Sequence, residues 1–266
     1  MQLASYMEGS NMKKLFIFIR LVIFFTIMFA LIIVLGKVFT PKWKNGTLSK
    51  MDGQDYTING YYELPKNSID VLFLGDSSIF KGVSPMEIYE QTGITSYNYS
   101  VSSARIYLLY YILEDAYKYQ KPKVIMIDPL TLFYTEKEVE PERRKSFDYM
   151  KFGKTKYEMI NDDFFEFDFK EKLSYYFPLF RYHSRWSEIN VSNVKRTFGS
   201  YHSITKGYIM STKINPRYTG FNYMNPSGRE VVMKDYTKKY LDMFVKFCKD
   251  NDIDLVFLGI PDTRAW

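Results

Sequence analysis

The chain has 266 residues, of which 46% are hydrophobic and 25% are charged, and its net charge is +6. This length suits one membrane segment and one domain of about 200 residues, and the composition is globular rather than disordered. Basic side chains are spread among acidic ones, which argues against nucleic-acid binding and favours anionic lipids or anionic wall polymers as partners. The one cysteine, Cys248, excludes an intrachain disulfide and a cysteine-based metal site.

The first predicted element is a membrane-spanning helix near the N-terminus. No charged residue occurs between Leu21 and Gly36, and the apolar run has the length of about 20 residues that a helix needs to cross the hydrocarbon core. Arg20 lies near one end, where its side chain can reach the interface. The run is long for a signal peptide and no clear A-x-A site follows it, so an uncleaved anchor is favoured over a cleaved signal sequence.

The basic residues around this helix leave its orientation open. Lys13, Lys14 and Arg20 lie on one side and Lys37, Lys42 and Lys44 on the other, so the positive-inside rule is nearly balanced. We expect a single-pass protein of the cell membrane with its domain outside the cytoplasm, and the reverse orientation is the alternative. The predicted segments are an N-terminal tail (1–12), a transmembrane anchor (13–38), a juxtamembrane linker (39–60) and a domain (61–266).

Strand and helix patterns alternate through the domain. Short apolar runs at 69–75, 95–101, 123–128 and 253–259 predict strands, and three of them are nearly continuous, as in parallel strands covered on both faces. Helical patterns occupy 85–93, 103–122 and 233–251. This order predicts an α/β fold with a doubly wound parallel sheet, incomplete at its C-terminal end. The aromatic and charged stretch from about 130 to 233 is predicted to be an insertion.

The chemistry is predicted at Gly75-Asp76-Ser77-Ser78, directly after the first strand. In an open α/β sheet the ligand crevice lies at the carboxyl ends of the strands. Gly75 permits a tight turn, and Asp76 belongs to that turn. Ser77 could then attack an acyl carbonyl, with the oxyanion stabilised by backbone N–H groups. Gly-Asp-Ser-Ser is also a good turn and N-cap sequence, so the motif alone does not decide between a turn and a nucleophile.

Three blocks of sequence together resemble the SGNH/GDSL hydrolase superfamily: FLGDSS (73–78), TSYNYSVSSAR (95–105) and KPKVIMIDPLTLF (121–133). The chain is most similar to membrane-anchored, extracytoplasmic members from Gram-positive bacteria, relatives of the D-alanyl-transfer protein of teichoic-acid modification. LFRYHSRW (179–186) is also similar to that branch. The resemblance covers about Tyr61 to Pro261 and implies a flavodoxin-like sheet with Ser77 as the nucleophile.

The second and third family blocks are matched less well. The second block supplies an oxyanion amide from a glycine, and Ser100 stands at that position, which keeps an N–H but makes close approach harder. The third block, Gly-x-Asn-Asp, has no match. Asp128 stands at the corresponding strand end, where it could orient a substrate or equally cap the next turn, since Pro129 follows it.

The general base of the family is not matched. The resemblance implies the histidine of an Asp-x-x-His beyond the last visible strand, and neither His183 nor His202 makes that motif. We therefore expect a C-terminally truncated family member. His183 lies between Arg181 and Arg185, which would keep it neutral; these three residues are candidates for substrate binding, and a packed loop is the alternative.

Two functions follow from these patterns. The first is an SGNH-type serine esterase or O-acyltransferase that acts on acyl groups of cell-envelope polymers and is impaired because its base is missing. The second is a non-catalytic, membrane-tethered envelope protein that binds a wall polymer or a partner enzyme. We expect neither a cofactor nor a metal site, because the sequence contains no cluster of metal-ligating residues.

Overall fold

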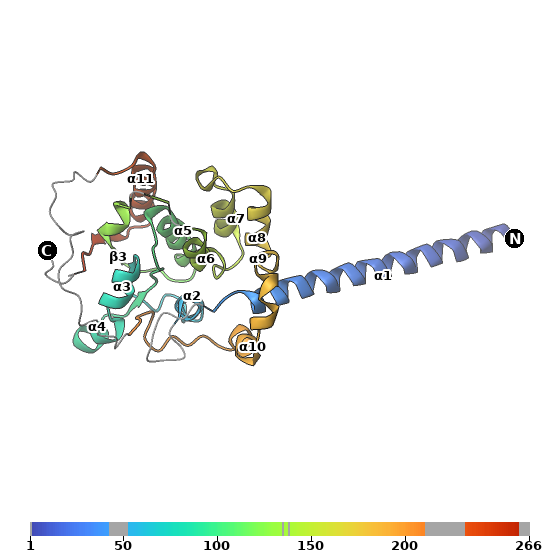
Figure 1. Cartoon of the computed structure of the whole chain (residues 1–266), viewed down its shortest axis with the longest axis horizontal. Helices are drawn as coiled ribbons and strands as arrows, with labels where there is room; N and C mark the ends of the chain where they lie inside the picture. The colour runs from blue at the N-terminus through green and yellow to red at the C-terminus, as the bar shows by residue number, and fades with distance from the viewer. Residues whose placement is uncertain (1, 43–52, 135, 138, 211–231, 261–266) are drawn as a thin grey trace. The chain divides into compact units, whose positions relative to one another are not determined.

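The computed structural model describes residues 2–42, 53–134, 136–137, 139–210 and 232–260. The chain divides into two compact units (Figure 1). Unit 1 consists of residues 1–41 and 167–198, and unit 2 consists of residues 42–166 and 199–266. The long N-terminal helix belongs to unit 1, and the sheet belongs to unit 2.

Unit 1 is built on one long helix, α1 (Gln2–Phe39). An 18-residue window within its stretch from Met12 to Phe39 has a mean hydropathy of 2.9, and this stretch is long and apolar enough to cross a membrane, as the predicted membrane-spanning helix requires. The predicted tail continues the same helix from Gln2 onward. Four short helical segments complete the unit: α8 (Phe169–Tyr176), α9 (Leu179–Tyr182), η3 (His183–Glu188) and α10 (Val191–Phe198).

Unit 2 contains a parallel sheet of four strands in the order β2-β1-β3-β4. The strands are β1 (Val71–Leu74), β2 (Ser96–Asn98), β3 (Val124–Ile127) and β4 (Asp254–Phe257). Each lies within a predicted run, so the α/β fold with a parallel sheet is confirmed. The register aligns Phe73 of β1 with Asn98 of β2 and with Met126 of β3, so the carboxyl ends of three strands lie together.

The helices of unit 2 cover the two faces of this sheet. From β1 to β2 the chain passes through α3 (Ser77–Gly82) and α4 (Pro85–Thr92), and from β2 to β3 through α5 (Ile106–Ala116). The two crossovers run in opposite directions across the sheet, so right-handed connections put α5 on the face opposite α3 and α4. The predicted helix at 233–251 is α11 (Asp235–Asp250), which packs against α5.

The helix α4 is capped at both ends. The Ser84 side chain accepts a hydrogen bond from Glu87 N, Pro85 occupies the first turn, and Gly93 ends the helix in the left-handed region with φ 73°. On the same face of the sheet, Val71 and Phe73 pack with Ile79 and Val83 of the α3 segment. This apolar cluster fixes α3 on the sheet immediately after the strand end that carries Gly75.

The predicted juxtamembrane linker differs from the structure in its second half. Residues 43–52 lie outside the described part, but α2 (Gln54–Tyr62) is a helix. Ile58 and Tyr61, three residues apart, are fully buried, and Tyr61 OH donates to Ala116 O at 3.1 Å. Polar residues of the same segment, Asp55, Thr57 and Asn59, hid the helix in the sequence.

The predicted insertion at 130–233 is divided between the units. Residues 167–198 belong to unit 1, while η1 (Pro129–Leu132), α6 (Glu140–Phe147), α7 (Lys154–Asn161) and η2 (Asp163–Phe165) belong to unit 2. Residues 211–231 lie outside the described part. The described remainder of this stretch is helical or irregular and contains no strand.

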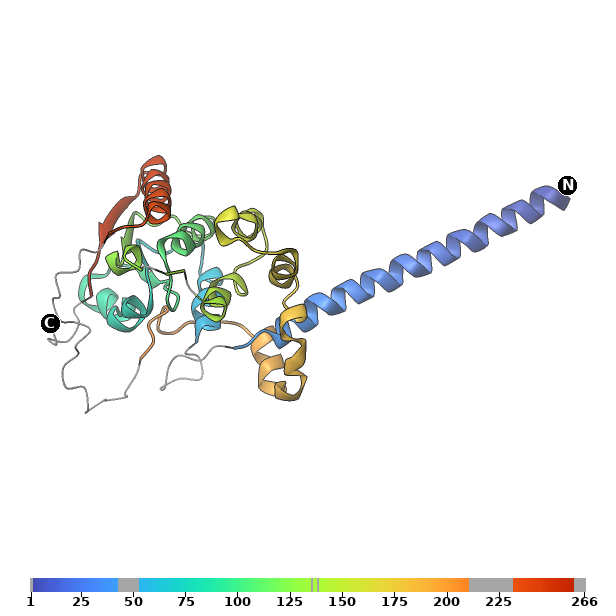
Figure 2. The same ribbon diagram turned by 45° about the horizontal axis from the view of Figure 1, so that its top comes forward.

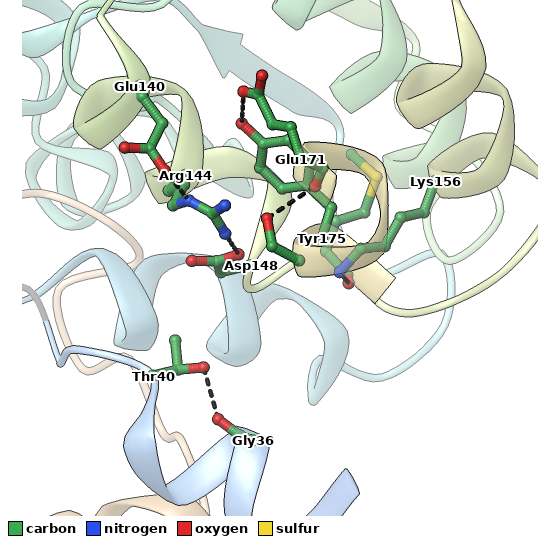
Figure 3. A network of polar contacts seen from close by, with 10 residues as sticks. Gly36, Thr40, Glu140, Arg144, Asp148, Lys156, Glu171 and Tyr175 are labelled. Atoms are coloured by element: carbon green, nitrogen blue, oxygen red, sulfur yellow. Dashed lines mark hydrogen bonds and ion pairs between the residues drawn. The ribbon is translucent and has the colours of Figure 1, made fainter. Parts of the chain in front are cut away.

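A buried ion cluster holds the α6–α7 part of unit 2 (Figure 3). The Arg144 guanidinium is 2% exposed and lies 2.5 Å from Glu140 Oε1 and 3.3 Å from Asp148 Oδ1. Lys156, also buried, donates to Met150 O at 3.1 Å, and burial lowers its pKa to about 8, against the opposing effect of Asp148. Pairing offsets much of the large cost of removing these charges from water, so the cluster has a structural explanation.

Candidate functional site at the end of β1

The turn after β1 requires a glycine. A Cβ added at Gly75 would lie 2.5 Å from Ile79 Cγ1 and 3.0 Å from Asp128 Cβ, closer than real Cβ atoms come. The strand ends of β1 and β3 therefore meet at this residue, and Asp128 N donates to Leu74 O at 3.2 Å. On the other side, Val101 N donates to Gly75 O at 3.0 Å, which ties in the segment after β2.

Asp76 organises the turn that the sequence predicted for it. The carboxylate is buried and caps α3, because it accepts from Ser78 N at 2.8 Å. It also accepts from Ser78 Oγ at 2.5 Å and from Tyr134 OH. Burial, and next the bond to Asp76, raise the pKa of Tyr134, so this phenol keeps its proton and donates it. The turn is thus held by three donors on one carboxylate.

Ser78 links Asp76 to a second buried carboxyl group, Asp128. The Ser78 Oγ lies 2.5 Å from Asp76 Oδ1 and 3.1 Å from Asp128 Oδ2. A hydroxyl carries one proton and can donate to one of these carboxyl groups only. Burial, opposed by the Leu130 N–H and reinforced by the charge of Asp76, raises the pKa of Asp128. Asp128 completes the chain of hydrogen bonds when it carries a proton and donates to Ser78.

Asp128 also caps the next turn, which was one of its two predicted roles. It accepts from Leu130 N at 2.9 Å, and Thr131 Oγ1 donates to Asp128 O at 2.6 Å. Its carboxyl group is fully buried. The predicted role in orienting a substrate has no further support from these contacts.

Ser77 differs from its neighbour Ser78 in the hydrogen bonds that its hydroxyl makes within the described part of the chain. The residue is half-buried at the first position of α3, and its Oγ makes no hydrogen bond with any residue in the described ranges. Ser78, one residue on, is bonded to two carboxyl groups. The arrangement fixes the turn through Ser78 and leaves the Ser77 hydroxyl available to a reaction partner.

Ser100 is buried beside β1, but its backbone does not face the turn. The residues on either side of it both bond to the β1 segment: Tyr99 N donates to Phe73 O at 2.9 Å, and Val101 N donates to Gly75 O at 3.0 Å. Successive N–H groups of an extended segment point to opposite sides, which directs the Ser100 N–H away from β1. The predicted oxyanion role of Ser100 has no support from this geometry.

Two further residues of the site, Arg105 and Tyr134, were not predicted from the sequence. The Arg105 guanidinium lies 4.3 Å above the Tyr134 ring, and Tyr134 OH donates to Asp76. Arg105 also donates to Ser103 O and, from Nε, to Glu136 O at 3.3 Å. Arg105 is the last residue of the second sequence block and Tyr134 follows the third, so their position after strand ends was the available signal.

The other predicted site residues belong to unit 1. The His183 Nδ1 lies 3.1 Å from Phe180 O, and the ring is exposed. Arg185 pairs with Glu188 at 2.7 Å and donates to Phe39 O at the end of α1. Arg185 thus has a structural role at a helix C-terminus, and substrate binding by His183, Arg181 and Arg185 stays a prediction.

The described part of unit 2 contains one histidine, His202, which is exposed with its Nδ1 3.8 Å from Glu63 Oε2. In the described ranges, no group of three or more His, Cys, Asp or Glu side chains is arranged to hold a metal ion. Cys248 is buried against the sheet helices, and burial raises the pKa of its thiol to about 11, which makes it a small apolar residue.

Comparisons of the chain with protein-family models, with curated proteins and with solved structures gave no match. The resemblance to SGNH hydrolases therefore rests on the three sequence blocks alone, and the site has to be judged by its own geometry.

Proposed function

We propose that unit 2 is an SGNH-type serine esterase or O-acyltransferase domain that acts on acyl groups of cell-envelope polymers, with Ser77 as the nucleophile. The strand order β2-β1-β3-β4 supports this, since it gives the first four strands of the flavodoxin-like order. In that order ligands bind where β1 and β3 lead the chain in opposite directions. Gly75 and Asp128 meet at this point, and Ser77 is two residues beyond it.

The observation that carries the proposal is the difference between the two serines. Ser78 is bonded to Asp76 and Asp128, whereas the Ser77 hydroxyl is half-buried and makes no hydrogen bond in the described part of the chain. Because Ser77 is only half-buried, its hydroxyl can bond to water in the free protein and to a substrate that displaces this water, so it is a functional candidate at this strand end. Asp76 and Tyr134 act as positioning residues that hold the turn.

The reaction would be acyl transfer in two steps. Ser77 Oγ attacks the acyl carbonyl and loses its proton to a base, the tetrahedral intermediate collapses, and the alcohol leaves with a proton. Water or an acceptor hydroxyl then attacks the acyl-serine and releases the acyl group. The Ser77 N–H can stabilise the oxyanion, and a second donor is not assigned.

No described residue is assigned as the general base for Ser77. His202 is directed to Glu63, and no side-chain bond in the described residues links an imidazole to Ser77. We therefore expect weak activity from this chain. The same observation favours a second candidate function, in which unit 2 binds an envelope polymer or a partner enzyme without catalysis.

For localisation we propose a single-pass protein of the cell membrane with unit 2 outside the cytoplasm. The support is α1, which has the length and hydropathy of a membrane span. An ester-linked wall polymer as substrate agrees with that side of the membrane, and the net charge of +6 agrees with an anionic polymer.

A fluorophosphonate probe tests the nucleophile directly, because it labels activated serines only. The full chain in detergent micelles is treated with the probe, beside Ser77→Ala and the matched control Ser78→Ala. We expect slow labelling that disappears in Ser77→Ala and persists, at a reduced rate, in Ser78→Ala, whose turn is loosened.

Two other outcomes would decide against catalysis by Ser77. Labelling that survives in Ser77→Ala would assign the reaction to another residue. An unlabelled wild-type chain that still binds lipoteichoic acid or peptidoglycan, with equal affinity in Ser77→Ala, would establish the binding function in its place.

A further inference from the structure

The short helices of unit 1 surround the C-terminal turns of α1. Figure 2 shows α8, α9 and α10, in yellow to orange, gathered at this end of the long helix. We call residues 167–198 the collar. A Cβ added at Gly36 of α1 would lie 3.4 Å from Leu179 N, so α9 approaches the α1 backbone closely. Thr197 of α10 donates to Lys37 O at 3.4 Å, and Arg185 donates to Phe39 O.

The collar extends along α1 into its apolar stretch. The Phe177 ring lies 5.9 Å from the Phe29 ring in an edge-to-face contact. Phe29 precedes Lys37, the first charge at this end, by eight residues, which is about 12 Å along a helix. If α1 spans a membrane, Phe177 is therefore at the depth of the acyl chains rather than above the headgroups.

The collar also exposes the side chains that a membrane interface favours. Trp186 is 74% exposed, and Phe169, Phe180, Val191, Val194 and Phe198 are exposed as well. On α10, the exposed Val191, Val194 and Phe198 recur at spacings of three and four residues and form one face, while Asn193, Arg196 and Thr197 are partly covered. Aromatic side chains at the headgroup level and an apolar helix face are typical of segments that lie in the interface.

The net positive charge of the collar also agrees with a position at a membrane interface. It contains six basic and three acidic side chains. The basic ones are Lys170, Lys172, Arg181, Arg185, Lys195 and Arg196. Basic side chains beside a membrane are attracted by anionic phospholipid headgroups, each by about 1 kcal/mol.

From the contact with Phe29, the exposed aromatic residues and the charge, we propose that the collar is a membrane-interface element. It lies in the headgroup–acyl boundary of the leaflet that α1 leaves at Lys37, with Phe177, Phe180 and Trp186 among the lipids. The exposed apolar surface of the collar is thereby covered by lipid. The inference rests on α1 crossing the membrane and is independent of the chemistry at Ser77.

Tryptophan fluorescence in lipid vesicles tests this. The chain has three tryptophans, Trp43, Trp186 and Trp266, so the full chain with Trp43→Phe and Trp266→Phe reports on Trp186 alone. It is reconstituted into phosphatidylcholine–phosphatidylglycerol vesicles whose lipids carry bromine either near the headgroup or deep in the acyl chain. We expect about a twofold or larger loss of emission with the shallow bromines, a smaller loss with the deep ones, and weak quenching by aqueous iodide.

A second reporter separates failure of the collar from failure of the membrane span. Phe25→Trp, placed in α1 of a chain that also carries Trp43→Phe, Trp186→Phe and Trp266→Phe, is expected to be quenched most by the deep bromines. Quenching at Phe25→Trp together with an iodide-accessible Trp186 that bromolipids do not quench would overturn the collar proposal alone.

Two further results would also overturn it. Absence of lipid quenching at both positions would show that α1 is outside the membrane, and the collar proposal would fall with the span. Protection of Trp186 from iodide without quenching by bromolipids, increasing with protein density in the vesicles, would show that a second copy of the chain covers the collar.

Discussion

Two segments of unit 2 have almost the same sequence and very different surroundings. IDVLFLG (69–75) contains the central strand β1, and IDLVFLG (253–259) contains the edge strand β4. All four residues of β1 are buried, whereas Val256 and Phe257 of β4 are 39% and 48% exposed. The local sequence determines that both segments are strands. The neighbours on each side determine which of them is covered.

The chain also continues differently after the two final glycines. Gly75 is followed by Asp76 and the two serines of the candidate site, whereas Gly259 is followed by Ile260, which packs against the apolar cluster on Val71 and Phe73. A polar site at a strand end therefore needs more than the strand and the glycine. It needs carboxyl groups that hydrogen-bond to the turn, and Asp76 and Asp128 supply these after β1.

The largest expected difference between the two segments is at their equivalent phenylalanines. Phe73→Ala removes a buried ring from the apolar cluster and should lower the free energy of unfolding by about 3–5 kcal/mol. Phe257→Ala removes a half-exposed ring and should cost less than about 1 kcal/mol. Urea unfolding of the detergent-solubilised full chain, followed by circular dichroism, measures both. Equal effects would mean that β4 is covered as fully as β1.

The two glycines should respond to alanine with opposite signs. At Gly75 an added Cβ meets Ile79 and Asp128, and this overpacking should destabilise by about 1–3 kcal/mol. At Gly259 nothing lies within 4 Å of the added Cβ, so alanine should be neutral or stabilise by about 0.4–1 kcal/mol through the unfolded chain. The same unfolding experiment compares them, and a tolerant Gly75 would contradict the close contact between β1 and β3.

The contrast between the two segments shows how much the sequence could predict. All four strands and three of the helices follow from apolar periodicity and from end signals such as Ser84 and Gly93. Which of the strands is central could not be predicted from local sequence, because IDVLFLG and IDLVFLG are nearly the same and the position depends on which strands pair on each side. The helix α2 was missed because its buried residues include the polar Asp55 and Thr57, so no apolar helical period marks it.

The candidate site, too, could be predicted from the sequence only in part. Gly75, Asp76 and Ser77 could be predicted from one short motif that the local chain geometry brings together. Tyr134 could not, because it reaches Asp76 from 58 positions away through β3 and η1. The difference in hydrogen bonding between the Ser77 and Ser78 hydroxyls could not be predicted from the sequence either. It depends on the carboxyl group of Asp128, which is 50 positions from Ser78.

The third prediction concerns the two carboxyl groups that distinguish the end of β1. Asp76→Ala removes the cap of α3 and the acceptor of Ser78 and Tyr134, and should destabilise by about 1–2 kcal/mol. Asp128→Asn is the matched control, because an amide can donate to Ser78 as a protonated carboxyl group does. It should cost much less at neutral pH.

The pH dependence of Asp128→Asn follows from the raised pKa of Asp128. A carboxyl group whose folded pKa is raised contributes stability below its unfolded pKa and loses it as the pH rises through the folded value. Wild type should therefore lose stability relative to Asp128→Asn as the pH rises above about 4. Parallel stability curves for the two proteins would refute a protonated Asp128.

The smallest expected effect is at the aspartates that open the two segments, Asp70 and Asp254. Asp70 accepts hydrogen bonds from Thr95 Oγ1 at 2.7 Å and from Thr95 N at 3.3 Å, and these bonds lower its pKa, with a smaller contribution from Lys123. Asp254 is exposed, and its side chain bonds to no residue in the described ranges.

The pH dependence of stability expected from Asp70 is opposite in direction to that expected from Asp128. A carboxyl group with a lowered folded pKa contributes stability above its unfolded pKa and loses it as the pH falls through the folded value. Asp70→Asn should therefore be slightly less stable than wild type at neutral pH, and the difference should vanish on acidification to about pH 3. Asp254→Asn should match the stability of wild type at neutral pH, because an exposed carboxylate whose side chain bonds to no described residue adds little to folding. If both variants followed wild type, the bonds to Thr95 would add nothing to the central strand, and the contrast between the two segments would rest on apolar burial alone.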